Sequence, residues 1–368
     1  MSRTWLAVAT AAVLALGVSA CGSSDNNSNA GTTGSGTSSS KSVTATLNGS
    51  GSTFAAPIYQ QLGSELKGQG LTINYQGVGS GQGVADLTNK STLFAGSDPP
   101  MTDEELTAAK KNGDVVHVPT AFGAITVSYN LSGVDTALKL DGPTIADIFL
   151  GKIKKWNDPA IAKLNSGVNL PSSNITVVHR SDESGTTKGF TAFLAASSKE
   201  WESKVGADKT VKWPTGTGAK GNDGVAAAIK QTPGSIGYVE QAYALQNNFT
   251  FADVKNKAGK FVKPTLGSVT AAGDGVTVPS DLRFTLGDSS NASSYPISSQ
   301  TFIIVYKDPC KAGASQNQAK GLLKFLDYVV GPGQETIKKL SYAPLPSAVD
   351  AKAKEAVKTL TCNGSAIS

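Results

Sequence analysis

Two patterns of apolar and polar positions alternate along most of the chain. Short apolar runs predict strands at Val43–Leu47, Leu71–Tyr75, Val115–Val118, Ala124–Tyr129, Ile175–His179, Ser235–Val239 and Phe302–Tyr306. Helical spacing between these runs predicts helices at Ala55–Leu66, from Val84–Leu87 onward, and at Asp103–Lys110, Ile145–Leu150, Thr187–Ala195, Val225–Lys230 and Ala319–Val330. Strands that alternate with helices predict an α/β fold with mainly parallel sheets.

The start of the chain follows neither pattern. Arg3 precedes an apolar run from Leu6 to Val18, and small residues then lead to Cys21. This run is too short to cross a bilayer, which takes roughly 20 residues, and a basic start with a short apolar core is typical of a secretory signal. The cysteine makes residues 1–20 resemble a bacterial lipoprotein signal peptide, with Cys21 as the lipidated new N-terminus. An ordinary signal peptide with a chance cysteine is the alternative.

Residues 21–42 are almost entirely Gly, Ser, Thr, Asn and Ala. Such a segment cannot bury enough apolar surface to order, and a coil of about 20 such residues reaches on the order of 25 Å. We therefore expect a disordered tether that holds the rest of the chain near the cell membrane, on its extracytoplasmic side.

The remaining residues are long enough for two ordinary domains, and charge and composition exclude several classes of protein. The formal net charge is +5, and loss of residues 1–20 would remove only Arg3, so +4 remains. This bias favours anionic ligands but is too weak for nucleic-acid binding. His117 and His179 are the two histidines, and no Cys/His spacing suits zinc. Cys310 and Cys362, outside the cytoplasm, are expected to form a disulfide.

Four short stretches rich in glycine and serine carry the candidate chemistry. They are Gly49–Phe54, Gly77–Gly81, Gly96–Asp98 and Arg180–Thr186. Three of them run directly into a predicted helix, whose first N–H groups and dipole favour an anion. Together they supply hydroxyls, bare backbone N–H groups, one guanidinium and one carboxylate. This set suits a small tetrahedral oxyanion that carries a proton for Asp98 to accept.

Each stretch alone also has an ordinary structural interpretation. Gly49–Phe54 and Gly77–Gly83 could be turns, Asp98 before a proline could be a helix N-cap, and Arg180 with Asp182 could be a structural ion pair. Their joint occurrence is what favours an oxyanion site.

Beyond these four stretches, the chain resembles the phosphate-binding protein of the phosphate-specific ABC transporter, the PstS family. The resemblance runs in family order from about residue 43 to 348. It rests on GSGSTFAAP ending at Pro57, NYQGVGS at Ser80, GSD at Asp98, LGKIKKWNDP at Pro159, RSDESGT at Thr186, KGNDG at Gly224, PGSIGYVE at Glu240 and PISSQTF at Phe302. The family has a small residue where Glu183 stands here.

The resemblance implies a two-domain periplasmic-binding-protein-like (type II) fold with a ligand cleft between the domains. The chain would cross between them near Gly123–Ile125 and Ser299–Phe302. Domain one would comprise residues 43–124 and 300–368, and domain two residues 125–299. We expect a monomer with no cofactor and no catalytic activity, whose partners are inorganic phosphate and the permease subunits of a phosphate ABC importer.

The family's ligand residues carry over onto nine positions. These are Ser52, Thr53, Phe54, Ser80, Asp98, Arg180, Ser184, Gly185 and Thr186. The residue chemistry agrees with this set, because Arg180 offers a fixed positive fork and the others offer hydroxyl or backbone donors. Asp182 is expected to orient Arg180 without touching the ligand, since a second carboxylate would repel a dianion.

Two enzyme classes are the rival interpretations. Gly216–Gly221 matches G-x-G-x-x-G, with Glu240 about 20 residues on, but such a match alone is weak evidence for a dinucleotide site. A hydrolase could use Ser80 or Ser184, yet the chain has no G-x-S-x-G elbow, and only His179 is near either serine in sequence.

Overall fold

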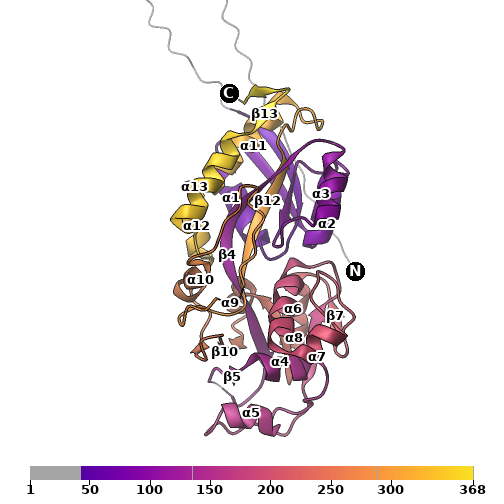
Figure 1. The fold of residues 1–368 in the computed structure, drawn as a ribbon, viewed down its shortest axis with the longest axis vertical. Helices are drawn as coiled ribbons and strands as arrows, with labels where there is room; N and C mark the ends of the chain where they lie inside the picture. The colour runs from indigo at the N-terminus through magenta and orange to yellow at the C-terminus, as the bar shows by residue number, and fades with distance from the viewer. Residues whose placement is uncertain (1–42, 135, 288, 368) are drawn as a thin grey trace, which may run out of the picture. The chain divides into compact units, whose positions relative to one another are not determined.

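The computed structural model describes residues 43–134, 136–287 and 289–367 (Figure 1). These residues belong to one compact unit. The predicted signal peptide, Cys21 and the tether lie outside them. Within the described residues, every helix is too short or too polar to cross a bilayer.

A nine-stranded sheet forms the centre of the fold. Its main order is β2-β1-β3-β12-β4-β8-β6-β7. In chain order the strands are β1 (Ala45–Gly51), β2 (Leu71–Gly77), β3 (Phe94–Ser97), β4 (Val115–Asn130), β6 (Thr176–Arg180), β7 (Thr217–Ala219), β8 (Ser235–Glu240), β9 (Thr250–Phe251, paired with β4) and β12 (Ser298–Tyr306).

The sheet is mixed, whereas the sequence predicted mainly parallel pairing. β1 is parallel to β2 and β3, and β6 is parallel to β7 and β8. β4 and β12, however, are antiparallel to all their partners. The helix connections that produce parallel pairs are therefore confined to the two ends of the sheet.

The two strands predicted at Val115–Val118 and Ala124–Tyr129 are one strand, β4. Its pairing with β12 shifts register where Phe302 faces Pro119 and Thr301 faces Ala121. This irregularity accommodates the proline, which cannot donate a ladder hydrogen bond. β4 therefore pairs with β12 along residues 115–124 and with β8 along residues 125–130.

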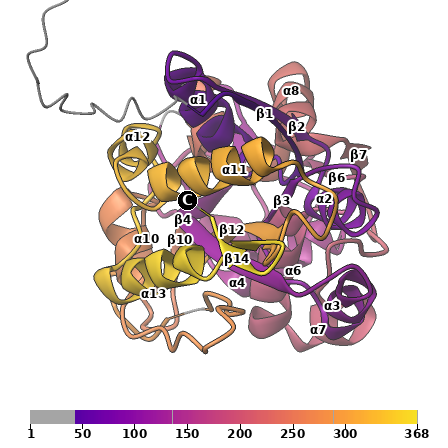
Figure 2. The same ribbon diagram turned by 90° about the horizontal axis from the view of Figure 1, so that it is seen from above.

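Helices surround this sheet, and all seven predicted helices are present. α1 packs on β2, α2 on β3, α11 on β1 and α13 on β4 (Figure 2). The helices are α1 (Ala56–Lys67), α2 (Ser80–Thr88), α3 (Asp103–Lys110), α4 (Gly142–Phe149), α5 (Pro159–Leu164), α6 (Gly185–Ser197), α7 (Lys199–Lys204), α8 (Gly221–Gln231), α9 (Gln241–Gln246), α10 (Leu266–Gly273), α11 (Gln316–Val329), α12 (Gly333–Lys339) and α13 (Ser347–Lys358).

Two small sheets complete the described elements. One has the order β11-β10-β5, from Phe261–Val262, Asp253–Lys255 and Lys139–Leu140. The other is a hairpin of β13 (Thr361–Cys362) and β14 (Ser365–Ala366). A disulfide between Cys310 and Cys362 joins this hairpin to the segment after β12, which confirms the predicted pairing. Closing a loop of this length contributes roughly 4 kcal/mol in the chain-entropy model.

The hydrophobic core is nearly continuous. One cluster includes residues from both ends of the sheet, among them Leu47, Phe325, Ile145 and Tyr238. The expected crossing points at Gly123–Ile125 and Ser299–Phe302 fall inside β4 and β12. The division into domain one and domain two stays a prediction.

Candidate functional site

The first candidate segment, Ser52–Phe54, connects β1 to α1. It turns at Gly51, which has φ +136° and would place a Cβ 2.1 Å from the carbonyl oxygen of Gly96, so only glycine fits there. Ser52 Oγ accepts from Ala55 N at 3.2 Å and donates to Asp98 Oδ1 at 2.6 Å. The side chains of this segment are buried.

The second and third candidate segments meet beside the first. Ser80 is the first residue of α2, and its hydroxyl accepts from the backbone N–H of Asp98 at 3.3 Å. Asp98 follows β3. Its carboxylate accepts from Thr301 Oγ1 at 2.9 Å, while its carbonyl accepts from Gln300 Nε2 at 2.6 Å. The loop at Asp98 is therefore held through both its backbone and its side chain.

The fourth segment combines the positive charge with another helix start. Arg180 ends β6, and Asp182 holds its guanidinium through Nε at 2.8 Å and Nη2 at 2.5 Å. Nη1 donates to Thr186 Oγ1 at 3.4 Å. Ser184 caps α6, so Gly185 and Thr186 supply its first turn. Asp182 therefore orients a guanidinium that is buried beside the N-terminus of α6.

Close packing brings the start of α6 against Asp98 and Ser80. A Cβ on Gly185 would lie 2.3 Å from Asp98 Oδ2 and 2.6 Å from Ser80 Oγ. The start of α2 also contacts the loop that precedes α6, because Gly81 N donates to the carbonyl of Glu183 at 3.1 Å. All nine predicted ligand residues lie in this region and are buried.

The two carboxylates of the region have opposite electrostatic environments. Burial raises the pKa of Asp98 to about 6, even though hydrogen bonds from Ser52 and Thr301 and the charge of Arg180 favour its ionised form. Burial also tends to raise the pKa of Asp182. The hydrogen bonds and the charge of Arg180 outweigh burial, so the pKa of Asp182 is lowered. Asp182 is thus a permanent counterion, whereas Asp98 can exchange a proton near neutral pH.

Asn222 is a site residue that the prediction did not include. Its Nδ2 donates to Thr53 Oγ1 at 2.9 Å and to Thr186 Oγ1 at 3.0 Å, and its backbone N–H also donates to Thr53 Oγ1. Asn222 therefore links two of the predicted ligand segments. It lies in the KGNDG stretch that carried part of the resemblance, and Gln300 and Thr301 lie in PISSQTF. The match of these two stretches to the family was the sequence signal that could have pointed to Asn222, Gln300 and Thr301.

The geometry gives little support to either enzyme interpretation. His179 contacts the carbonyl of Arg180 through Nδ1 at 2.9 Å and stacks on Trp213, while Ser184 Oγ accepts from Thr187 N. In the glycine motif, Gly221 N donates to Asp182 Oδ1 at 3.0 Å. Within the described residues, no cluster of His, Cys, Asp or Glu could hold a metal ion.

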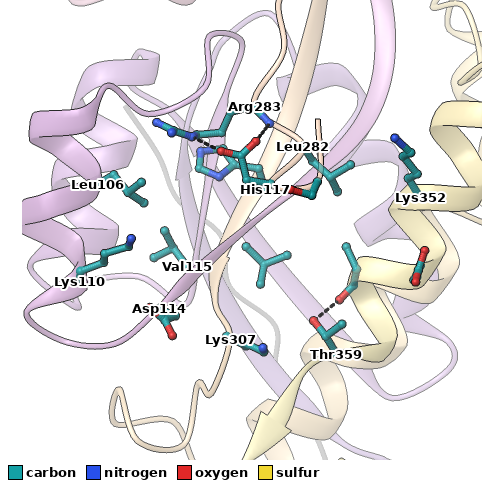
Figure 3. A pocket seen from close by; sticks show the side chains of 15 residues that line it. Leu106, Lys110, Asp114, Val115, His117, Leu282, Arg283, Lys307, Lys352 and Thr359 are labelled. Carbon is teal, nitrogen blue, oxygen red and sulfur yellow. Dashed lines mark hydrogen bonds and ion pairs between the residues drawn. The ribbon is translucent and has the colours of Figure 1, made fainter. Parts of the chain in front are cut away.

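A cavity of about 700 Å³ lies outside this region. It is lined by α3, the start of β4, the loop at Leu282 and Arg283, and α13 (Figure 3). The residues that line it carry charges of both signs, including Lys110, Lys307 and Glu355. None of the nine predicted ligand residues lines it.

Comparisons with known proteins agree with this architecture. The sequence model of a protein family described as "PBP superfamily domain" matches residues 28–332 of this chain. The Phosphate-binding protein PstS of Pasteurella multocida is 42% identical over 318 residues, which are 85% of this chain and 90% of that protein. The protein of the same name from Methanocaldococcus jannaschii is 39% identical over 283 residues, 72% of each chain.

Solved structures show the same fold at lower identity. A high affinity periplasmic phosphate-binding protein bound with phosphate (PfluDING) has a TM-score of 0.69 at 24% identity and covers 84% of this chain and 93% of its own. A phosphate-binding protein from Stenotrophomonas maltophilia has a TM-score of 0.65 at 19% identity, with 84% and 93% covered.

Proposed function

We propose a function from the premise that this chain belongs to the PstS family of phosphate-binding proteins, within the PBP superfamily. It binds inorganic phosphate with high affinity outside the cytoplasm and delivers it to an ABC importer. Like its relatives, it is a binding protein and not an enzyme. The observation that carries the proposal is the convergence of Asp98, Ser80 and Gly185, which is so close that a Cβ on Gly185 would clash with both side chains, together with the charge of the buried Arg180 guanidinium acting on Asp98.

The nine predicted residues divide the work of holding a phosphate. Backbone N–H groups at the starts of α1 and α6 donate to its oxygens, from Thr53, Phe54, Gly185 and Thr186. Hydroxyls donate to the phosphate from Thr53, Ser80, Ser184 and Thr186, while the Ser52 hydroxyl donates to Asp98 and holds that carboxylate in place. The Arg180 guanidinium supplies a positive charge whose direction Asp182 fixes. Helix dipoles and charge-assisted hydrogen bonds replace the water that the anion loses in a buried site.

Asp98 selects phosphate over oxyanions of similar size that carry no proton. Near pH 7 both forms of phosphate keep at least one proton, which an ionised carboxylate can accept in a hydrogen bond. Sulfate has no proton at this pH, so it would set two acceptors against each other in a buried site. A site built to read a hydrogen bond rejects a ligand that lacks it by roughly 10⁴ or more.

We further propose that Cys21 carries the lipid that anchors the protein to the cell membrane. The support is the sequence alone: a short apolar run, small residues and a cysteine, followed by a flexible segment. The protein acts as a monomer and hands phosphate to the permease subunits of the importer.

Calorimetry with a panel of oxyanions tests the phosphate proposal. The purified protein, stripped of endogenous phosphate, should bind phosphate at one site, bind arsenate, and ignore sulfate at comparable concentration. Arg180→Ala should weaken phosphate binding by on the order of 2–5 kcal/mol, and Arg180→Lys should recover only part of it, because lysine lacks the bidentate fork. Sulfate that displaces phosphate, or unchanged affinity in Arg180→Ala, would contradict the proposed site.

A further inference from the structure

Three consecutive carbonyl groups of the β1–α1 segment each accept a hydrogen bond from a tyrosine. Tyr75 OH donates to the carbonyl of Ser52 at 2.9 Å. Tyr243 OH donates to the carbonyl of Thr53 at 2.7 Å, and Tyr342 OH lies 2.6 Å from the carbonyl of Phe54. We refer to Tyr75, Tyr243 and Tyr342 as the tyrosine clamp.

The clamp determines where the next N–H groups point. A trans peptide is planar, so a carbonyl and the following N–H point in opposite directions. Tyr75 thus orients the N–H of Thr53, and Tyr243 orients the N–H of Phe54. Neither N–H has a hydrogen-bond acceptor among the described residues. The third N–H in the series, that of Ala55, instead donates to Ser52 Oγ.

The three tyrosines come from distant parts of the chain. Tyr75 is on β2, Tyr243 on α9, and Tyr342 follows α12. Tyr243 lies in the segment expected to form domain two, whereas Thr53 lies in domain one. The hydrogen bond from Tyr243 therefore joins the two expected domains at the predicted ligand residues, as the bonds from Asn222 to Thr53 also do.

Each clamp hydroxyl keeps its proton. Burial raises the pKa of Tyr75 and of Tyr243 well above the ordinary value for tyrosine. Tyr342 OH also lies 2.8 Å from Glu240 Oε2, and burial raises the pKa of Glu240 as well. One hydroxyl proton cannot serve both Phe54 and Glu240, so a protonated Glu240 would donate to Tyr342, which then donates to Phe54.

We propose that Tyr75 and Tyr243 are positioning residues for phosphate: their hydroxyls hold two peptide groups so that the N–H groups of Thr53 and Phe54 donate to the anion. This inference rests on the proposed function. A carbonyl that accepts a hydrogen bond also polarises its peptide group, which strengthens the N–H as a donor. The clamp therefore acts on both the direction and the strength of these two donors.

Two variants that remove one hydroxyl each test the clamp by calorimetry with inorganic phosphate. Tyr243→Phe and Tyr75→Phe should each weaken phosphate binding about tenfold, the usual effect of one lost hydrogen bond. Tyr129→Phe is the matched control, because Tyr129 OH donates to the carbonyl of Thr136 and touches no predicted ligand residue. Its phosphate affinity should stay within about twofold of the wild type.

Amide resonances separate positioning from a general loss of stability. In phosphate-saturated protein, Tyr243→Phe should move the Phe54 amide proton upfield more than that of Thr53, and Tyr75→Phe should do the reverse. The Gly185 amide should stay in place in both variants. Wild-type affinity, or a loss of affinity with unmoved Thr53 and Phe54 amides, would overturn the clamp alone. A wild-type protein that does not bind phosphate would overturn the proposed function and the clamp together.

Discussion

Asp98 shows how a buried carboxylate can be kept exchangeable at the scale of one residue. Burial favours its neutral form, whereas the hydroxyls of Ser52 and Thr301 and the charge of Arg180 favour its ionised form. The first effect is larger, so the pKa rises to about 6. Above this pH the carboxylate can only accept hydrogen bonds, and below it the protonated carboxyl group can also donate one. Lowering the pH should therefore weaken the rejection of unprotonated anions.

The raised pKa of Asp98 predicts that the selectivity against sulfate depends on pH. If sulfate binds only beside protonated Asp98, its affinity follows the protonated fraction and should rise on the order of 30-fold between pH 7.5 and pH 5. Titration of phosphate-free protein with sulfate at several pH values measures this. Asp98→Asn removes the titrating group and should flatten the profile. A flat profile in the wild type would mean that Asp98 does not control sulfate binding.

The start of α6 gives a prediction at the scale of an element. Gly185→Ala would place a methyl group 2.3 Å from Asp98 Oδ2, so the helix start must retreat from the site. We expect phosphate affinity to fall at least tenfold, because misplacing the donors of a binding site is costly. The phosphate-free protein should also lose about 1–3 kcal/mol of stability, because the added methyl overpacks a buried region.

Gly267→Ala is the matched control for this substitution. Gly267 also lies in the first turn of a helix, α10, and the nearest atom to an added Cβ is Thr265 Oγ1 at 4.0 Å. Its phosphate affinity should equal that of the wild type. Equal affinity in Gly185→Ala and Gly267→Ala would show that the start of α6 need not approach Asp98 so closely.

Elements with a strong local signal were predictable from the sequence. α11 was predicted from its apolar face, and the predicted helix at Asp103–Lys110 has the bounds of α3. β4 was predicted as two strands on either side of Pro119. Its continuity depends on the register shift in its pairing with β12, which the local sequence does not reveal. The two-residue strands β5 and β11 are too short for any periodicity.

Motifs in the sequence led to the nine predicted ligand residues, which the structure brings to one region, but the side chains that support them were not predictable. Asn222 contacts Thr53 from 169 positions away, and Tyr342 contacts Phe54 from 288 positions away. Asn222 lies in a stretch that matched the family, but neither its contact with Thr53 nor the bond from Tyr342 to the carbonyl of Phe54 can be inferred from the neighbouring sequence. Such contacts follow from the fold, which brings α8, α9 and the segment after α12 to the β1–α1 segment.

At the scale of the whole molecule, the proposed lipid anchor on Cys21 gives a prediction about where the protein is found in the cell. If a lipid on Cys21 anchors the protein, as we propose, Cys21→Ser should release it into the medium, because the acyl chains would supply its hold on the membrane. Fractionation of cells followed by detection in membrane and medium measures this, and Ser24→Ala in the same segment should stay membrane-bound. A wild-type protein already in the medium would favour an ordinary signal peptide, and a membrane-bound Cys21→Ser protein would exclude the lipid anchor.

The place of β12 in the sheet has a consequence for the order in which the protein can fold. β12 lies between β3 and β4, although about 170 residues separate it from the end of β4 in the chain. A chain that emerges from a ribosome or a membrane pore N-terminus first cannot close this gap until Tyr306 has appeared. Until then β3 and one edge of β4 lack their partner, and an incomplete sheet of this kind is prone to aggregate. We therefore expect late insertion of β12 to delay folding until most of the chain has been made, and an unfolded chain is the form that could pass through a narrow export channel.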